Sequence, residues 1–406
     1  MADEENDRII AFNPRQMTLK VIISTNGSAP YPVDQAGAEH VYAITRGSKS
    51  IDVISNQNLK RIRTIPLTHY PRSAAYNKVT RLAIVSGRKK PVTSVIDTKT
   101  HQVVATVGTD SITTPNDFGG SLATGHPFWV TEDKFLLLDR ANRKIELYVV
   151  SENKGKYDVL LSDSLMLNTS VHHVLSVPNA QGSDKNMGKN NRFYGIAEGA
   201  PNDDISPGVI EFDVSGEKLI KRKTIHMLTN EVDAEDMGSH HATFHPDGKH
   251  IYLGSNEGFT YVINRLSMSV VKTIKTGLGN GHTTMIPGRM IGVSTNHNDR
   301  FMTILNLTTH EKIIDVYISD LATDPKRKTQ SHTSSFDPEN DRFFYTAASN
   351  EGRIIEIDLE KFSVSREIEF KCGSYPIQGT FVWRYQNLIP RINADQPPNY
   401  LNPDFL

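Results

Sequence analysis

The chain has 406 residues, and its 45 Lys and Arg against 46 Asp and Glu leave a net charge of −1. This balance gives no overall attraction to nucleic acid or to an anionic membrane surface, so we expect neither as a partner. The longest apolar runs, such as DKFLLLD, are far shorter than the roughly 18 residues of a membrane span. A lone Cys372 excludes an internal disulfide and a thiolate zinc cluster, so a metal site must use nitrogen and oxygen ligands.

The N-terminal segment MADEENDRIIAF has no apolar core of the kind that defines a secretory signal. Met1 followed by Ala-Asp-Glu-Glu-Asn is typical of a mature chain to which an initiator methionine was added after the signal had been removed. We therefore expect a periplasmic protein, with a cytoplasmic location as the alternative.

Short runs of Val, Ile, Tyr, Phe and Thr, separated by Gly, Asn, Asp and Lys turns, follow one another from residue 8 to residue 384. No long segment shows a helical period, so the fold class is all-β. One type of strand recurs in chain order as HVYAITR, RLAIVSG, KFLLLDR, RFYGIAE, HIYLGSN, MIGVSTN and RFFYTAA. The strand after it recurs as SIDVIS, TSVIDT, IELYVV, VIEFDV, TYVINR, MTILNL and IIEIDL.

Four strands in every 40 to 50 residues or so are typical of a propeller blade, which predicts seven complete blades. The strands within residues 8–29 and 374–384 would close an eighth, composite blade, so we expect eight blades, with seven as the alternative. The whole chain, 1–406, forms one domain in this interpretation. The Pro- and Asn-rich segment 385–406 is expected to be a surface strap, and the polar segment NAQGSDKNMGKNN a long loop.

The repeat resembles the YVTN-type propeller repeats. The closest copies are HVYAITRGSKSIDVIS and IYLGSNEGFTYVIN, and the resemblance extends over almost the whole chain. It implies a propeller fold and says little about function, because unrelated activities share this architecture.

Histidine occupies the same position at the start of the first strand in five successive blades. The aligned segments are HPFWVT, HVLSVP, HATFHP, HTTMIP and HTSSFD, beginning with His126, His173, His241, His282 and His332. First strands line the channel of a propeller, so these imidazoles would point toward one axis. His172 and His240 precede two of them, and His297 lies in a loop on the same face. Several imidazoles crowded together without a metal would repel one another on protonation, so we predict a metal or catalytic site.

The remaining histidines fit structural or surface roles, as most single histidines do. His101, His226 and His310 lie in outer strands or their turns, and His245 and His250 flank the HPDGKH turn at the opposite end. His40 and His69 fit either the metal or catalytic site or a structural role.

Neutral imidazole binds zinc, copper, iron and nickel, and copper(II) stands highest in the divalent affinity order. Because three or four ligands fill a zinc site, seven first-strand histidines predict more than one ion. This arrangement resembles the catalytic domain of nitrous oxide reductase and thiocyanate dehydrogenase. The resemblance implies that seven histidines ligate copper, namely His126, His172, His173, His240, His241, His282 and His332. The chain lacks the cupredoxin domain of the reductase, and eight blades differ from their seven, so a separate electron carrier would be needed.

The resulting hypothesis is a copper-cluster oxidoreductase acting on a small molecule at the channel mouth. Glu198 is the candidate acid or base, and Lys89 or Lys90 would attract an anion. One alternative is a periplasmic metallochaperone for zinc or copper of the AztD type, which would need a metal-transfer partner. The others are a mononuclear iron oxygenase similar to the carotenoid-cleaving propellers and a non-catalytic scaffold.

Overall fold

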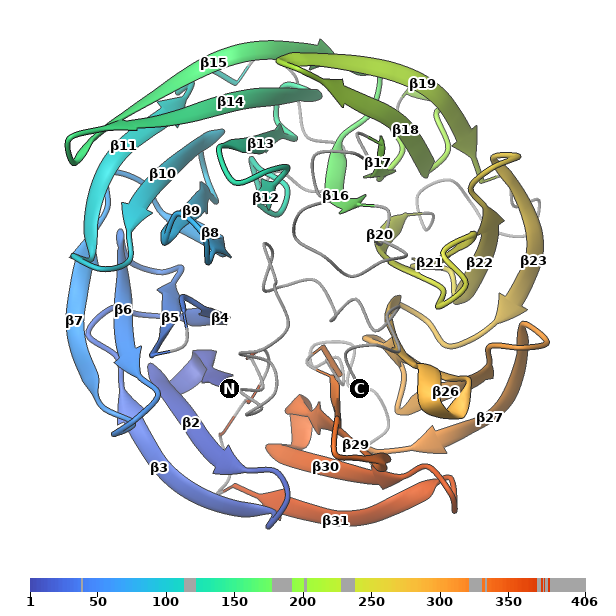
Figure 1. Ribbon diagram of the computed structural model, residues 1–406. Coiled ribbons are helices and arrows are strands. Elements are labelled where there is room, and N and C mark those ends of the chain that lie inside the picture. The colour runs from blue at the N-terminus through green and yellow to red at the C-terminus, as the bar shows by residue number, and fades with distance from the viewer. Residues whose placement is uncertain are drawn as a thin grey trace.

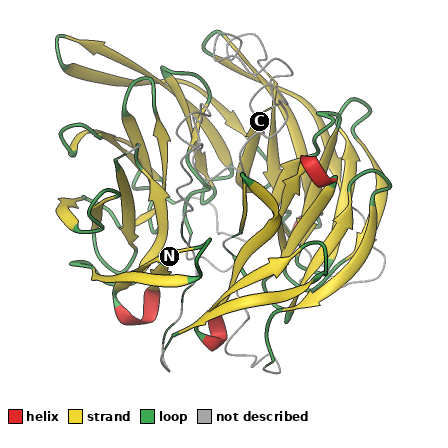
Figure 2. Ribbon diagram, turned by 60° about the horizontal axis from the view of Figure 1, so that its bottom comes forward, coloured by secondary structure: helices red, strands yellow, loops and turns green. Residues whose placement is uncertain are grey.

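Eight antiparallel sheets stand around a central axis in the computed structural model, which makes the protein an eight-bladed β-propeller (Figure 1). Figure 2 shows that strands make up nearly all the regular structure. The structure describes residues 1–37, 39–112, 122–176, 192–200, 203–227, 238–320, 331–332, 334–370, 374, 376 and 379. Within these residues the helical segments are η1 (Glu4–Asn6), η5 (Pro287–Arg289) and η6 (Ser349–Glu351). None of the described helices has the length and hydropathy needed to cross a membrane.

Seven blades follow one another along the chain, each with its four strands hydrogen-bonded in sequence order. Blade 1 contains β4 (Pro30–Gln35), β5 (His40–Thr45), β6 (Ser50–Ser55) and β7 (Arg61–Pro66). Blade 2 contains β8 (Pro71–Asn77), β9 (Leu82–Gly87), β10 (Val92–Asp97) and β11 (Gln102–Gly108). Blade 3 contains β12 (Phe128–Trp129), β13 (Lys134–Asp139), β14 (Lys144–Asn153) and β15 (Lys156–Met166). Blade 4 contains β16 (Val171–Ser176), β17 (Arg192–Ala197), β18 (Gly208–Ser215) and β19 (Lys218–His226).

The last three sequential blades have the same order of strands. Blade 5 contains β20 (Ser239–Phe244), β21 (His250–Ser255), β22 (Phe259–Asn264) and β23 (Ser269–Lys275). Blade 6 contains β24 (Asn280–Ile286), β25 (Ile291–Asn296), β26 (Phe301–Asn306) and β27 (Glu311–Tyr317). Blade 7 contains β28 (Ser335–Asp337), β29 (Asn340–Ala348), β30 (Arg353–Asp358) and β31 (Ser363–Glu369).

The eighth blade is composite, as the sequence predicts. It contains β1 (Ala2–Asp3), β2 (Arg8–Asn13) and β3 (Thr18–Ser24), and Asp3 forms an antiparallel bridge with Pro376 from the other end of the chain. Sequence analysis missed β1, because two residues are too few to show an alternating pattern. The predicted strap at 385–406 and loop at 179–191 lie outside the described residues.

Burial explains why the second and third strands of each blade are so apolar. Both faces of β6, for example, are buried, whereas the outer strand β7 is mostly exposed. Hydrophobic side chains fill the space between blades, as where Leu136 and Leu147 of blade 3 share a cluster with Phe193 and Phe212 of blade 4. Packing on both faces produces continuous apolar runs and a rigid frame around the channel.

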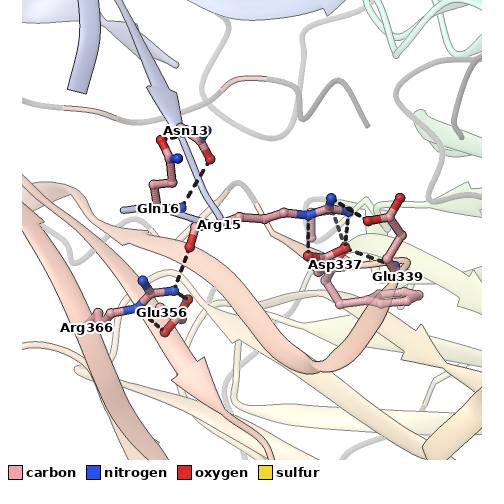
Figure 3. A network of polar contacts seen from close by, with 9 residues as sticks. Asn13, Arg15, Gln16, Asp337, Glu339, Glu356 and Arg366 are labelled. Atoms are coloured by element: carbon pink, nitrogen blue, oxygen red, sulfur yellow. Dashed lines mark hydrogen bonds and ion pairs between the residues drawn. The ribbon is translucent and has the colours of Figure 1, made fainter. Parts of the chain in front are cut away.

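Ion pairs join the composite blade to blade 7 (Figure 3). Arg15, in the turn between β2 and β3, donates two hydrogen bonds to Asp337, at 2.6 and 2.8 Å, and also pairs with Glu339. Arg366 of β31 donates to the Arg15 carbonyl at 3.0 Å and is itself paired with Glu356. These contacts between residues more than 300 positions apart help to close the ring.

Candidate metal centre

The inner strands of five blades share a break in register near the channel. In β4, β8, β16, β20 and β24 the pairing with the second strand shifts by one residue soon after the strand begins. The shifts fall beside His172 in β16, His241 in β20 and His282 in β24. Such bulges turn side chains away from the regular alternation and are frequent at functional sites. They let neighbouring residues of one strand both approach the channel.

Seven of the eight predicted metal-ligating histidines lie together in one group, named here the channel histidine cluster. The side chain of the eighth, His240, lies outside the described residues. Ring centres are 4.6 Å apart for His126 and His173, 3.5 Å for His241 and His282, and 4.7 Å for His297 and His332. The members are His126, His172, His173, His241, His282, His297 and His332.

His241 lies in the middle of the cluster. Its ring centre is within 6.5 Å of those of all six other members. Donor atoms of His241, His297 and His332 all lie within 4.8 Å of one another, a spacing from which three side chains could hold one ion. A Cβ at Gly281 would lie only 2.4 Å from His297 Nε2, so glycine at this position leaves the space that the imidazole needs.

Burial lowers the pKa of two channel histidines, His126 and His173. Burial, together with the nearby positive charge of Arg72, lowers the pKa of His173 to about 3. Burial also holds the pKa of His126 well below its usual value, with Arg72 and His173 adding to the effect. Neutral imidazole has a free lone pair, which is the state in which histidine binds metal. The cluster is therefore suited to nitrogen ligation near neutral pH.

A buried network of charged groups borders the cluster. Arg140 donates two hydrogen bonds to Glu198, at 2.7 and 2.6 Å, and Glu198 Oε1 lies 2.9 Å from His172 Nδ1. Arg72 Nη2 lies 3.2 Å from Nε2 of the same histidine. His172 can therefore donate from Nδ1 to the carboxylate while Nε2 accepts from the guanidinium. To bind a metal through Nε2, it would need Arg72 to move.

Arg72 is a buried cation that sequence analysis missed. It is 1% exposed, and its Nε and Nη1 have no hydrogen-bond partner among the described residues. Burial lowers its pKa well below the usual value, as do the charges of Arg140 and Arg46. The signal was positional, since Arg72 precedes Ser73 in β8 as His172 precedes His173 in β16. A buried guanidinium with open donors favours an anion beside the histidines.

The structure also places the other candidates. Glu198, the predicted acid or base, lies against the cluster through His172. Lys89 is exposed, and its Nζ lies 4.3 Å from the centre of the Tyr70 ring, while Lys90 pairs with Asp110 at 2.6 Å. The catalytic roles of Glu198 and Lys89 stay predictions. His69 is buried and hydrogen-bonded to Ser94 at 2.9 Å.

Comparisons with known proteins give the fold. No family model matches the chain, and no curated protein does. Among solved structures, dihydro-heme d1 dehydrogenase NirN in complex with DHE is similar with a TM-score of 0.61 at 13% identity, over 91% of this chain and 70% of that one. A protein from Lactobacillus plantarum gives 0.56 at 13% identity over 73% and 86%, and a candidate 6-phosphogluconolactonase from Bacteroides uniformis gives 0.55 at 17% identity over 76% and 90%. At such identities the likeness shows a shared propeller fold alone.

Proposed function

We propose that the channel histidine cluster binds a copper cluster and that the protein is an oxidoreductase acting on a small anion. The observation that carries the proposal is the packing of six imidazoles around that of His241, each with its ring centre within 6.5 Å. Three or four ligands fill a mononuclear zinc site, so the six members other than His172 favour more than one ion. Among the metals that bind imidazole, copper has the highest divalent affinity and changes oxidation state.

The close spacing of the channel histidines favours small ions as ligands. Rings of the cluster lie 3.5 Å apart at His241 and His282 and 4.6 Å apart at His126 and His173. Such packing suits small ions held between side chains.

The residues beside the cluster support proton transfer and anion binding. Copper bound here would supply one-electron redox steps and a Lewis acid. His172 has the geometry to accept a proton at Nε2 once Arg72 turns to a bound anion, since Glu198 at 2.9 Å from Nδ1 would stabilise the resulting imidazolium. Arg140 holds the Glu198 carboxylate in place with two hydrogen bonds. In this proposal Glu198 positions His172, and the other histidines ligate the metal.

The proposal includes a separate electron carrier and a periplasmic location. The carrier is needed because a redox reaction of the substrate would require electrons to be supplied to the site or removed from it. Both are proposals that follow from the chemistry, and fractionation of the native host would test the location.

Metal content is the direct test. Protein purified without a metal-affinity resin is expected to contain two or more copper ions per chain by elemental analysis. Copper(II) bound by nitrogen should give visible absorption and a paramagnetic resonance signal, both bleached by a reductant. One zinc ion that passes to an acceptor protein without redox change would replace the proposal with a metallochaperone, and no bound metal would favour a scaffold.

Arg72 gives a second test of the substrate class, with azide as a small anionic probe. Azide titrated into the copper-loaded protein is expected to change the visible spectrum, and Arg72→Gln should raise its Kd about tenfold, equivalent to roughly 1.4 kcal/mol. The control is Arg222→Gln, because Arg222 is exposed and pairs with Asp213 on an outer strand. Equal azide affinity in both variants would show that Arg72 is no anion subsite.

A further inference from the structure

A second group of histidines lies at the opposite end of blades 5 and 6 from the channel histidine cluster. The turn between β20 and β21 carries His245 and Asp247, and His250 begins β21. His310 comes from the turn between β26 and β27 of the next blade. Ring centres are 5.9 Å apart for His245 and His250, 5.2 Å for His245 and His310, and 4.9 Å for His250 and His310. This four-residue group is named the interblade cluster.

The hydrogen bonds of His245 determine which ring nitrogen has a lone pair. Nε2 lies 2.9 Å from the Leu307 carbonyl oxygen, which can only accept, so Nε2 must donate a proton there. Nδ1 of the neutral ring is then an acceptor, and the backbone N–H of Asp247 donates to it at 3.2 Å. The same Nδ1 lies 3.0 Å from Asp247 Oδ1. Two acceptors at this distance repel each other unless a cation, either a proton or a metal ion, lies between them.

His250 and His310 complete the group from two blades. His250 Nδ1 lies 2.6 Å from Asp247 Oδ2, so the carboxylate stands between two imidazoles. Donor atoms of His245, Asp247 and His250 all lie within 4.8 Å of one another. A tetrahedral zinc ion with bonds of about 2.0–2.1 Å needs donors roughly 3.3 Å apart, so small side-chain rotations would suffice. His310 Nδ1 lies 2.6 Å from the Tyr252 hydroxyl, which orients its ring toward the group.

Blades 1 and 2 contain an equivalent arrangement of two histidines and one tyrosine. His40 begins β5 as His250 begins β21, and its ring centre lies 4.8 Å from that of His101. The Tyr42 hydroxyl lies 3.3 Å from His101 Nδ1, as Tyr252 does at 2.6 Å from His310. In blade 5 the backbone N–H of His245 donates to the carbonyl oxygen of His250. In blade 1 the equivalent N–H, which donates to the carbonyl oxygen of His40, belongs to Ala36. The His–Tyr–His contact is therefore a repeated feature, and His245 and Asp247 are added to it in blade 5.

We propose that the interblade cluster binds zinc or a similar divalent transition-metal ion, with His245 Nδ1, Asp247 and His250 as ligands and His310 as the fourth. The ion would connect blade 5 to blade 6 and be shared by His245 Nδ1 and the Asp247 carboxylate, which lie 3.0 Å apart. Imidazole and carboxylate are both ordinary zinc ligands. Three of the four residues come from one turn, and the fourth comes from the neighbouring blade.

The test measures the zinc content of the 406-residue chain after its metals have been removed with a chelator. Equilibrium dialysis against buffered zinc should show one zinc ion per chain fewer for His250→Ala/His310→Ala than for the unchanged protein. The matched control, His40→Ala/His101→Ala, removes the corresponding pair and should keep the full content. Cobalt(II) should give the intense visible bands of tetrahedral coordination, lost in the first double variant and kept in the second.

Two further variants separate folding and the channel from this site. Asp247→Asn keeps every histidine and should still weaken zinc binding at least tenfold, while circular dichroism shows an unchanged fold. His241→Ala, which disrupts the channel histidine cluster, should keep the interblade zinc ion. Equal zinc content in the two double variants, or equal losses in both, would overturn the proposal whatever the channel binds.

Discussion

Replacing His241 with alanine is expected to remove at least half of the copper bound by the protein. The reason is its central place, with a ring centre within 6.5 Å of all six other members of the channel histidine cluster. His126→Ala, His282→Ala and His332→Ala should each cause a smaller loss, because each removes a donor nearer the edge of the group. Elemental analysis of equally loaded proteins measures the effect.

His226→Ala is the control for this series. His226 lies at the end of the outer strand β19, is exposed, and its Nδ1 lies 2.8 Å from the Ser206 carbonyl oxygen. Its copper content should equal that of the unchanged protein. A thermal midpoint of metal-free His241→Ala close to that of the unchanged metal-free protein would show that the fold survives. If all variants bind the same amount of copper, the channel histidine cluster is not the metal site.

The propeller was predictable from sequence because each blade repeats the same burial pattern. Middle strands such as β6 and β13 are packed on nearly every side, so Val, Ile and Leu recur at the same spacing in every blade. The composite blade followed from strands left over at the two ends of the chain. The two-residue strand β1 was not predictable, since its pairing with β2 and with Pro376 is a property of ring closure.

The histidines of the site were predictable, and their electrostatic partners largely were not. Aligned first strands bring imidazoles together in any propeller, so repetition alone identified His126, His173 and His282. Arg72 lacks a repeated sequence signal, because the equivalent bulge positions in other strands hold different residue types. The bond of Glu198 to His172 joins two strands of one blade, and its two bonds from Arg140 depend on the neighbouring blade. Contacts of this kind require the folded geometry.

The interblade cluster was not recognisable as a group from the sequence. Sequence analysis assigned His245, His250 and His310 to structural or surface roles because they lie in turns far from the channel. Because His250 and His310 are far apart in the sequence, the sequence does not show that their ring centres lie 4.9 Å apart. The related pair His40 and His101 does support a structural role for the repeated contact. The interblade cluster differs from the pair His40 and His101 by the presence of His245 and Asp247.

The metal-free protein is expected to lose stability steeply as the pH falls from 6.5 to 5. The pKa of His173 is lowered to about 3 in the folded state, and that of His126 is also well below its usual value, whereas both return to about 6.5 on unfolding. Below pH 6.5 the unfolded chain therefore binds protons that the folded chain does not, so stability decreases with falling pH. Well above pH 6.5 both states are neutral at these groups, and the effect vanishes.

The size of this effect follows from the linkage between proton binding and folding. With its pKa lowered to about 3, His173 alone removes about 1.7 kcal/mol between pH 6.5 and 5, and the lowered pKa of His126 adds to the decline. His173→Gln should make the decline roughly half as steep, while His226→Gln, at an exposed site, should leave it unchanged. Copper should raise the thermal midpoint strongly at pH 8 and hardly at pH 5, because the ligands must be deprotonated. A thermal midpoint that is independent of pH over this range in metal-free protein would mean that these histidines protonate freely in the folded state, and the cluster would then lack the neutral donors that metal binding requires.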